Sequence, residues 1–263
     1  MTRCFPLATA FFAISGACFA QPAATGFEVA TIKPTAPGVQ GRWIRMLTPH
    51  EFEAKNHALK TLLAAAYDLN PRAISGGPAW VDADHYDILA KTPGEARPNL
   101  NEQMAMLRTL LSERFQLTFH RERRELQVLA FTVAKGGSKM KESTVSPDAP
   151  PAAPPLLAFV VMPQLIRLPG RNVSMAELAS VMQRAALDHP VLDRTGLTAR
   201  YDFDLEFTPD ETVFGGALGR GADDAAKPGL FAALQQQLGL RLEATRGPVE
   251  MLIIDRVERP SAN

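Results

Sequence analysis

Three aspartates grouped around one histidine are the residues most suited to metal chemistry. Asp82, Asp84 and Asp87 surround His85, and a hard cation such as Ca²⁺ prefers several carboxylate oxygens close together. The segment lacks the glycine and the distal glutamate of an EF-hand loop. Because aspartate is also common in turns, we interpret the group as a turn that leads into a strand. We predict neither a metal site nor a cofactor.

The motifs of common hydrolases are missing or out of place. A zinc hydrolase needs two ligands on one helix face, as in H-E-x-x-H, and none of the five histidines has such a neighbour. Residues 138–141 (SKMK) match S-x-x-K, in which the lysine activates the serine, but they begin a proline-rich stretch. The sequence also has no G-x-S-x-G elbow. We therefore predict no catalytic residue.

Two glycine-containing loops are the best candidates for binding. Residues 75–80 (SGGPAW) and 193–197 (DRTGL) each come shortly before a Tyr-Asp pair, and glycine allows a positive φ and a close approach of the backbone. Aromatic and arginine side chains dominate binding hot spots, although for Trp80 the alternative is a ring that caps the core. The predicted binding residues are Gly76, Gly77, Trp80, Tyr86, Arg194 and Tyr201.

The densest run of charge is residues 120–125 (HRERRE). Basic clusters can bind phosphates, but two glutamates interleave here, so we favour a hairpin tip exposed to water. Over the whole chain Lys plus Arg equals Asp plus Glu at 28 each. No strong net field therefore draws the protein to nucleic acid, and no nucleic-acid partner is predicted.

The first 20 residues have the layout of a secretory signal. A positive start is followed by an apolar run and by small residues before Gln21, so we expect cleavage after Ala20, with lipidation of Cys18 as the alternative. Both cysteines, Cys4 and Cys18, lie in this segment, which leaves the exported chain without thiol chemistry. No later apolar stretch is long enough to span a bilayer. We expect an exported protein, periplasmic or secreted, with no transmembrane segment in the mature chain.

An internal repeat organises the rest of the sequence. A shift of 123 positions places residues 107–131 on residues 230–254, and apolar positions coincide throughout, as for Leu111 with Leu234 and Phe131 with Ile254. Such agreement predicts two copies of one unit. The expected domains are residues 21–140, a proline-rich linker at 141–156, and residues 157–263 with a long loop at 209–229.

The hydrophobic periods give the order of elements in each unit. Helices are predicted at 58–67 and 101–115 in the first unit, and at 174–186 (with a capping box) and 230–238 in the second. Strands are predicted at 86–90 and 201–207. Two hairpins follow, 116–120 with 126–133 and 241–243 with 249–257, the second marked by a turn at 246–248 (RGP). The fold class is α+β, a tandem duplication of a helix-strand-helix-hairpin unit, each with a small, mainly antiparallel sheet packed by two helices. An opening strand at 27–33 is free to pair with either sheet.

Several short sequence segments, in a fixed order along the chain, resemble those of a known family. These are residues 27–34 (FEVATIKP), 74–80 (ISGGPAW), 193–197 (DRTGL) with 201–203 (YDF), and 257–261 (VERPS). The chain is similar to a secreted domain-of-unknown-function family expanded in soil bacteria and also found fused to membrane metallopeptidases of the β-lactam-sensor type. The resemblance implies an extracytoplasmic sensing or binding role, and it assigns no catalytic residue. The element order also resembles the short N-terminal domains of secretins and TonB-dependent transducers, at the level of fold only.

Three functions remain open from the sequence. The first is a non-enzymatic binding module that docks a protein or a cell-envelope component. The second is a periplasmic hydrolase with a site assembled between the two units, from the acids near His85 or from His189 and Asp193. The third is a structural protein whose edge strands pair between chains.

Overall fold

The computed structural model describes residues 26–39, 41–145, 157, 159–162, 165–214 and 227–260. Strands account for 43% of this part of the chain and helices for 25%. The strands form three four-stranded sheets. The predicted α+β duplication of helix-strand-helix-hairpin units is therefore wrong, and the fold is mostly β.

The first lobe contains a sheet in the order β1-β5-β3-β2, in which all neighbours are antiparallel. The opening strand β1 thus pairs with β5, the strand of the first Tyr-Asp pair. Burial alternates with a period of two along β5. The elements of this lobe are β1 (Val29–Pro34), β2 (Trp43–Thr48), β3 (Glu51–Ala58), α1 (Leu59–Tyr67), β4 (Ile74–Gly76), α2 (Trp80–Ala83), β5 (His85–Lys91) and α3 (Leu100–Arg114).

The second lobe contains the antiparallel sheet β7-β11-β9-β8. Its helices α4 and α5 each continue into a short π-helix. The elements are β7 (Lys141–Glu142), β8 (Val160–Met162), β9 (Leu165–Val173), α4 (Met175–Val181), its π-helical extension (Met182–Ala186), β10 (Val191–Asp193), β11 (Tyr201–Phe207), α5 (Leu230–Ala233) and its π-helical extension (Leu234–Leu238).

Local sequence signals account for the helices. In α4 the Ser174 hydroxyl accepts a hydrogen bond from the Glu177 N–H (3.3 Å), and the Glu177 carboxylate accepts one from the Ser174 N–H (2.8 Å). This is the predicted capping box, which satisfies donors that a helix start leaves free. Asn99 and Glu102 form the same box at the start of α3. The four predicted helices are confirmed within a few residues.

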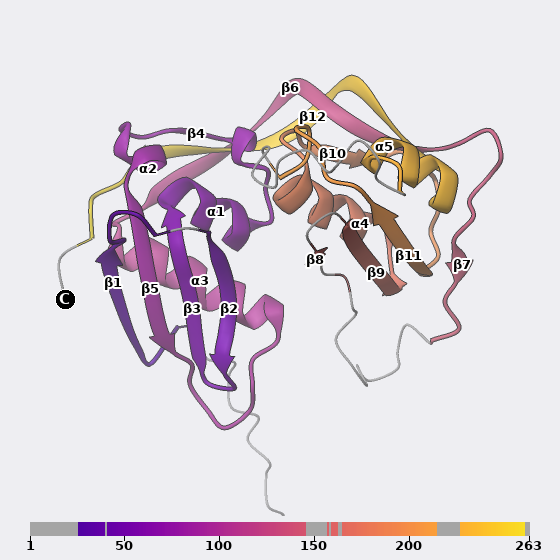
Figure 1. The fold of residues 1–263 in the computed structure, drawn as a ribbon. Coiled ribbons are helices and arrows are strands. Elements are labelled where there is room, and N and C mark those ends of the chain that lie inside the picture. The colour runs from indigo at the N-terminus through magenta and orange to yellow at the C-terminus, as the bar shows by residue number, and fades with distance from the viewer. Residues whose placement is uncertain are drawn as a thin grey trace, which may run out of the picture.

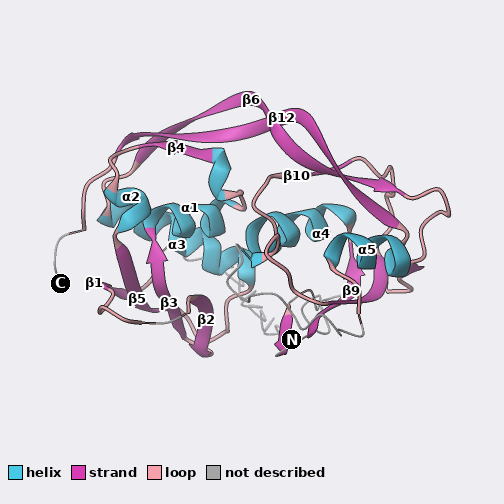
Figure 2. Ribbon diagram, turned by 45° about the horizontal axis from the view of Figure 1, so that its top comes forward, coloured by secondary structure: helices cyan, strands magenta, loops and turns pink. Residues whose placement is uncertain are grey.

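Two long strands join the lobes. β6 (Thr118–Val133) and β12 (Leu240–Arg256) pair antiparallel from one end to the other. The short strands β10 and β4 add in parallel to β6 and β12, respectively, at opposite edges, giving the order β10-β6-β12-β4. We call the pair β6 and β12 the long ribbon. It crosses above the helices of both lobes (Figures 1 and 2).

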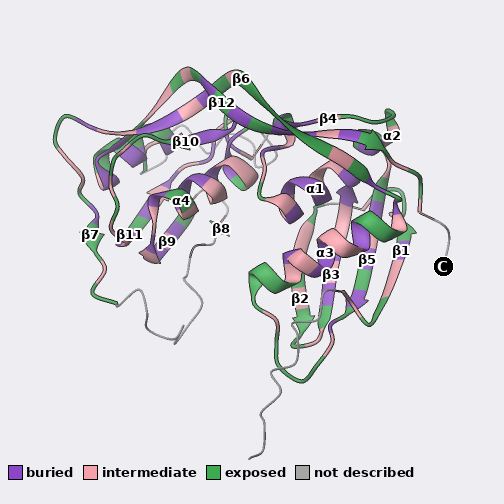
Figure 3. Ribbon diagram, turned by 180° about the vertical axis from the view of Figure 1, so that it is seen from behind, coloured by how far each residue is buried: buried purple, intermediate pink, exposed green. Residues whose placement is uncertain are grey.

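Both predicted hairpins are therefore wrong, and the charged run is not a hairpin tip but part of the exposed first half of β6 (Figure 3). In the predicted turn of β12, Gly247 is closely packed: a Cβ there would lie 2.7 Å from Leu192 Cδ1, so the Leu192 side chain would have to shift. Pro248 has no N–H donor. The strand tolerates this because β4 pairs with β12 only from Leu252 to Ile254, and no other described strand pairs with the outer edge of β12 at Pro248.

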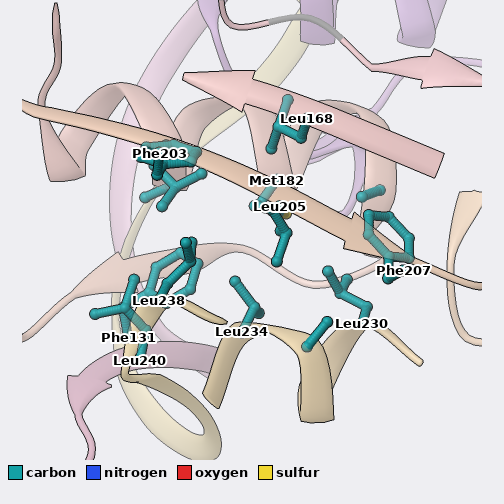
Figure 4. Close-up of a cluster of buried hydrophobic side chains, with 14 of the residues drawn as sticks. Phe131, Leu168, Met182, Phe203, Leu205, Phe207, Leu230, Leu234, Leu238 and Leu240 are labelled. Carbon is teal, nitrogen blue, oxygen red and sulfur yellow. The ribbon is translucent and has the colours of Figure 1, made fainter. Parts of the chain in front are cut away.

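Two large hydrophobic cores lie beneath the ribbon. The core of the first lobe combines the inner face of its sheet with α1 and α3, and it includes Leu252 and Ile254 of β12. The core of the second lobe combines its sheet with α4 and α5, and it includes Phe131 of β6 (Figure 4). β6 belongs to the first predicted domain but contributes to the core of the second lobe. β12 belongs to the second predicted domain but contributes to the core of the first lobe.

Some predictions fall on residues that the structure does not describe. The signal segment, residues 146–156 of the predicted linker and residues 215–226 of the predicted long loop lie outside the described residues. The signal, the linker and the domain boundaries stay predictions.

Candidate functional site

The two glycines of the first predicted binding loop hold the end of β4 against β12. Gly76 has a φ of +84°, and a Cβ on it would lie 2.6 Å from the Ile254 carbonyl oxygen. Gly77 has a φ of +76°, and its Cβ would lie 3.2 Å from Val81. Both positions therefore demand glycine for conformation and for space.

Trp80 and Tyr86 lie close to these glycines and pack on one ring. The Trp80 ring stacks on Phe115 at 6.4 Å between centroids, and the Tyr86 ring meets Phe115 edge-on at 5.4 Å. The Arg259 guanidinium lies 5.2 Å from the Trp80 centroid and donates from Nε to Asp84 Oδ2 at 2.9 Å. We call Trp80, Asp84, Tyr86 and Phe115 the aromatic corner.

The environment of Tyr86 opposes its ionisation. Burial raises the pKa of the Tyr86 phenol, the Asp84 carboxylate raises it further, and Arg259 counteracts both through its charge and a hydrogen bond. Tyr86 is 4% exposed. Its ring therefore belongs to the core, whereas Trp80 is only partly covered.

The aspartates of the two Tyr-Asp pairs stabilise bulges in neighbouring strands. Asp87 Oδ1 accepts the Asn56 N–H at 3.0 Å, and Asp202 Oδ1 accepts the Asn172 N–H at 2.7 Å. Both asparagines have a positive φ, 56° and 54°, which asparagine tolerates better than most residues. Sequence reasoning missed this role, although an Asn at the end of a strand before each helix was a visible signal.

Burial alone would raise the pKa of Asp87. Hydrogen bonds from Lys55, the Asn56 N–H and Thr35, together with the Lys55 charge, outweigh the effect of burial. They hold the pKa of the Asp87 carboxyl below its usual value. The neighbouring acids also have partners, since Asp82 pairs with Lys60 at 3.1 Å and Asp84 with Arg259. In the described part of the chain no three His, Cys, Asp or Glu residues are grouped as metal ligands.

The remaining predicted binding residues, Arg194 and Tyr201, lie in the second lobe. Arg194 follows β10, where its N–H bonds to the Phe131 carbonyl at 2.9 Å, and its guanidinium donates to the Arg246 carbonyl at 3.3 Å. Tyr201 is 5% exposed and belongs to the core of the second lobe. The structure therefore brings Gly76, Gly77, Trp80 and Tyr86 together and separates them from Arg194 and Tyr201.

A pocket in the long ribbon was not anticipated from the sequence. Its volume is about 340 Å³, and both strands and the segment before β10 contribute to it. We call it the ribbon pocket. The lining residues are Gln127, Val128, Leu129, His189, Ala244, Thr245 and Arg246. A guanidinium, an imidazole, an amide and a hydroxyl thus surround aliphatic side chains, which is a common composition for ligand sites.

A polar cluster fixes His189 at the ribbon pocket. His189 Nδ1 lies 2.5 Å from Asp188 Oδ1, and Nε2 lies 3.3 Å from Arg72 Nη1. Because arginine only donates, Nε2 accepts from Arg72, and Nδ1 carries the proton donated to Asp188. Arg72 also donates to Asp188 at 2.7 Å. Arg72 lies in a short 3-10 helix (Pro71–Ala73) of the first lobe, and Asp188 and His189 precede β10. Residues from both lobes thus position this imidazole.

A second cavity of about 350 Å³ lies where the last π-helix ends. Lys135, Lys139 and Arg241 are among its lining residues. Lys139, part of the S-x-x-K match, donates from Nζ to the Gln236 carbonyl at 2.8 Å. This cation therefore caps helix carbonyls that have no partner within the helix.

A family model, described as "Protein of unknown function (DUF3738)", matches residues 60–257. The chain belongs to this family. No curated protein and no solved structure matches it. The predicted resemblance to a family of unknown function is thus confirmed at that level, while its expansion in soil bacteria, the metallopeptidase fusions and the likeness to secretin and TonB-associated domains stay predictions. No helix in the described residues is long and apolar enough to cross a bilayer.

Proposed function

We propose that this protein is an exported binding module, periplasmic or secreted, that docks a protein or a cell-envelope component through the ribbon pocket. The observation that carries the proposal is the pocket itself, with its volume of about 340 Å³ and its mixed lining. Small-molecule sites have volumes of roughly 300–1,000 Å³ and combine apolar walls with a few polar groups. The pocket fits one side chain or one small headgroup of a larger partner.

The rigidity of the pocket supports this proposal. Its walls come from two strands that are paired along their length, and its His189 is held by two charged neighbours. A site on paired strands loses little conformational freedom when it binds. Arg194, which bonds to the Arg246 carbonyl, extends the polar surface beside the pocket, and Trp80 offers a separate, partly covered aromatic surface.

The alternative is a periplasmic hydrolase, and one observation favours it. His189 and Asp188 form the imidazole–carboxylate pair that orients a general base. In this arrangement Arg72 occupies Nε2, so a base function would require Arg72 to move away first. For that reason we place the binding module ahead of the hydrolase.

Capture from envelope extracts tests the proposal. The chain from Gln21 onward is immobilised, and retained molecules are identified by mass spectrometry. Ala244→Phe fills the pocket, because Ala244 is an exposed lining residue, and we expect it to abolish retention of a saturable partner. Ala232→Phe is the matched control, since Ala232 is exposed on α5, and it should retain the partner fully.

Equal retention by the wild type and the Ala244→Phe variant would refute the pocket as the docking site. Turnover of a substrate that is lost in His189→Gln, with no partner retained, would replace the binding module by the hydrolase.

A further inference from the structure

We propose that the aromatic corner is a binding site for a guanidinium group, and that Arg259 of the chain's own C-terminal segment is its built-in occupant. A partner segment that presents an arginine would bind by displacing Arg259. This site is distinct from the ribbon pocket, so the proposal stands or falls independently of the proposed function.

Three different groups contact the Arg259 guanidinium. The Trp80 ring lies 5.2 Å from its central carbon, which is the geometry of a cation–π interaction. Asp84 Oδ2 lies 2.9 Å from Nε and 2.9 Å from Nη2. Tyr86 adds a hydrogen bond. A flat cation with several donors matches a ring face beside a carboxylate better than a lysine ammonium does.

The aromatic ring and the carboxylate of the site are held in place without the Arg259 side chain. Phe115 of α3 supports both aromatic rings. Val81, which is 2% exposed, anchors α2 in the core, and the Asp84 N–H bonds to the Trp80 carbonyl at 2.9 Å. These contacts position the ring and the carboxylate before any cation arrives, which lowers the cost of binding.

The segment that carries Arg259 is held much less firmly. Residues 257–260 follow β12 and have no regular structure. A backbone hydrogen bond runs from the Glu258 N–H to the Phe115 carbonyl at 2.7 Å. Val257 packs against the core of the first lobe, whereas the Arg259 side chain is 61% exposed. An incoming arginine can therefore reach the site from solvent, and removal of Arg259 leaves the cores unchanged.

The test follows the Trp80 indole N–H resonance by NMR during titration with Nα-acetyl-arginine amide. The chain has two tryptophans, so Trp43→Phe assigns the Trp80 signal. In Arg259→Ala we expect a saturable shift with a dissociation constant of roughly 10–100 mM, because an exposed cation–π contact and an exposed ion pair each contribute roughly 1 kcal/mol. The wild type should bind more weakly, because the tethered arginine competes for the same site.

Two controls make the outcome decisive. Nα-acetyl-citrulline amide has the same shape without the charge and should leave the resonance unchanged. Arg256→Ala, which removes a C-terminal arginine that pairs with Glu258, should behave like the wild type. No saturable shift in a folded Arg259→Ala protein, or an equal shift with the citrulline compound, would overturn the proposal.

Discussion

His57 gives the first lobe a specific sensitivity to acid. The side chain is buried, its Nδ1 lies 3.1 Å from the Thr61 hydroxyl, and Nε2 has no hydrogen-bond partner in the described protein. The pKa of His57 is lowered from 6.5 to about 4, mainly by burial and also by the Arg42 charge, and the Trp43 backbone opposes this shift only in part. The folded state thus holds a neutral imidazole that the unfolded chain would protonate.

The resulting pH dependence has a defined sign. Because the folded pKa is the lower one, the unfolded state binds more protons between pH 6.5 and pH 4, and stability falls as the pH drops through that window. Chemical denaturation at pH 7.5 and pH 4.5 should show a loss of about 2–3 kcal/mol from this residue. His57→Leu should remove that part of the difference, and an identical pH dependence in variant and wild type would rule out this role.

Asp87 is expected to stabilise the bulge in β3. Asp87→Ala removes an acceptor from the Asn56 N–H, Thr35 and Lys55, and we expect it to cost about 1.5–3 kcal/mol in urea denaturation at pH 7. The pKa of Asp87 is lower in the folded state than its usual value. This contribution to stability is therefore present at pH values above the usual aspartate pKa, and it is lost as the pH falls through the lowered pKa of the folded state.

Asp82→Ala is the control for Asp87→Ala. Its side chain is 62% exposed and pairs with Lys60, so the change should cost less than about 1 kcal/mol. Similar losses for the two variants would contradict the special role of Asp87.

Individual residues were predicted from the sequence only where their effect is local. The loop glycines Gly76 and Gly77 were recognisable because turn chemistry depends on neighbouring residues. The ribbon pocket was not, because His189 and Arg246 come together only through the pairing of β10, β6 and β12.

At the level of elements, the long ribbon is closely packed at Gly247 in β12, where there is no side chain. Gly247→Val would place a Cβ 2.7 Å from Leu192 Cδ1 and 3.1 Å from Arg194 Nη2. Both atoms end flexible side chains that can shift, so we expect a loss of about 1 kcal/mol, at the low end of overpacking. Thermal unfolding should show the loss. Ala244→Val, at an exposed position of the same strand, should be nearly neutral. Full stability of Gly247→Val would contradict the close packing at this position.

The four helices and the Tyr-Asp strands β5 and β11 were predicted, whereas the long ribbon and the strands β2, β3, β8 and β9 were not. Capping and the 3.6-residue period act within one segment, so α3 and α4 were recognisable. In β6 the charged run interrupts the apolar alternation, and charges instead pair across strands, as Arg121 does with Glu250. Pairing between segments so distant in sequence leaves no local pattern, and the Gly-Pro step in β12 is typical of a turn.

At the scale of the molecule, the lobes share their cores and should depend on each other. Beyond the long ribbon, Asn70 donates from Nδ2 to the Gln183 carbonyl at 2.7 Å, and Asp68 pairs with Arg184 at 2.7 Å. The fragment 26–145 lacks β12 and therefore lacks Leu252 and Ile254 of its core. We expect it to give the poorly dispersed NMR spectrum of an unfolded chain.

Mixing fragments 26–145 and 157–260 should restore a folded complex, because the long ribbon then forms between them. A dispersed spectrum and cooperative unfolding of fragment 26–145 alone would show instead that the predicted domain boundary separates two autonomous units.

Hydrogen–deuterium exchange of the wild-type chain, with and without its retained partner, tests the binding proposal most directly. In the described part of the chain no strand pairs with the outer edge of β12 at Ala244 and Arg246, because β4 pairs with β12 only from Leu252 onward. Amides there should therefore exchange readily in the free protein. Bound partner should slow exchange at 127–129 and 244–246, the strand residues of the ribbon pocket. Protection confined to the outer face of the β1-β5-β3-β2 sheet, with unchanged exchange in these two segments, would contradict the proposal.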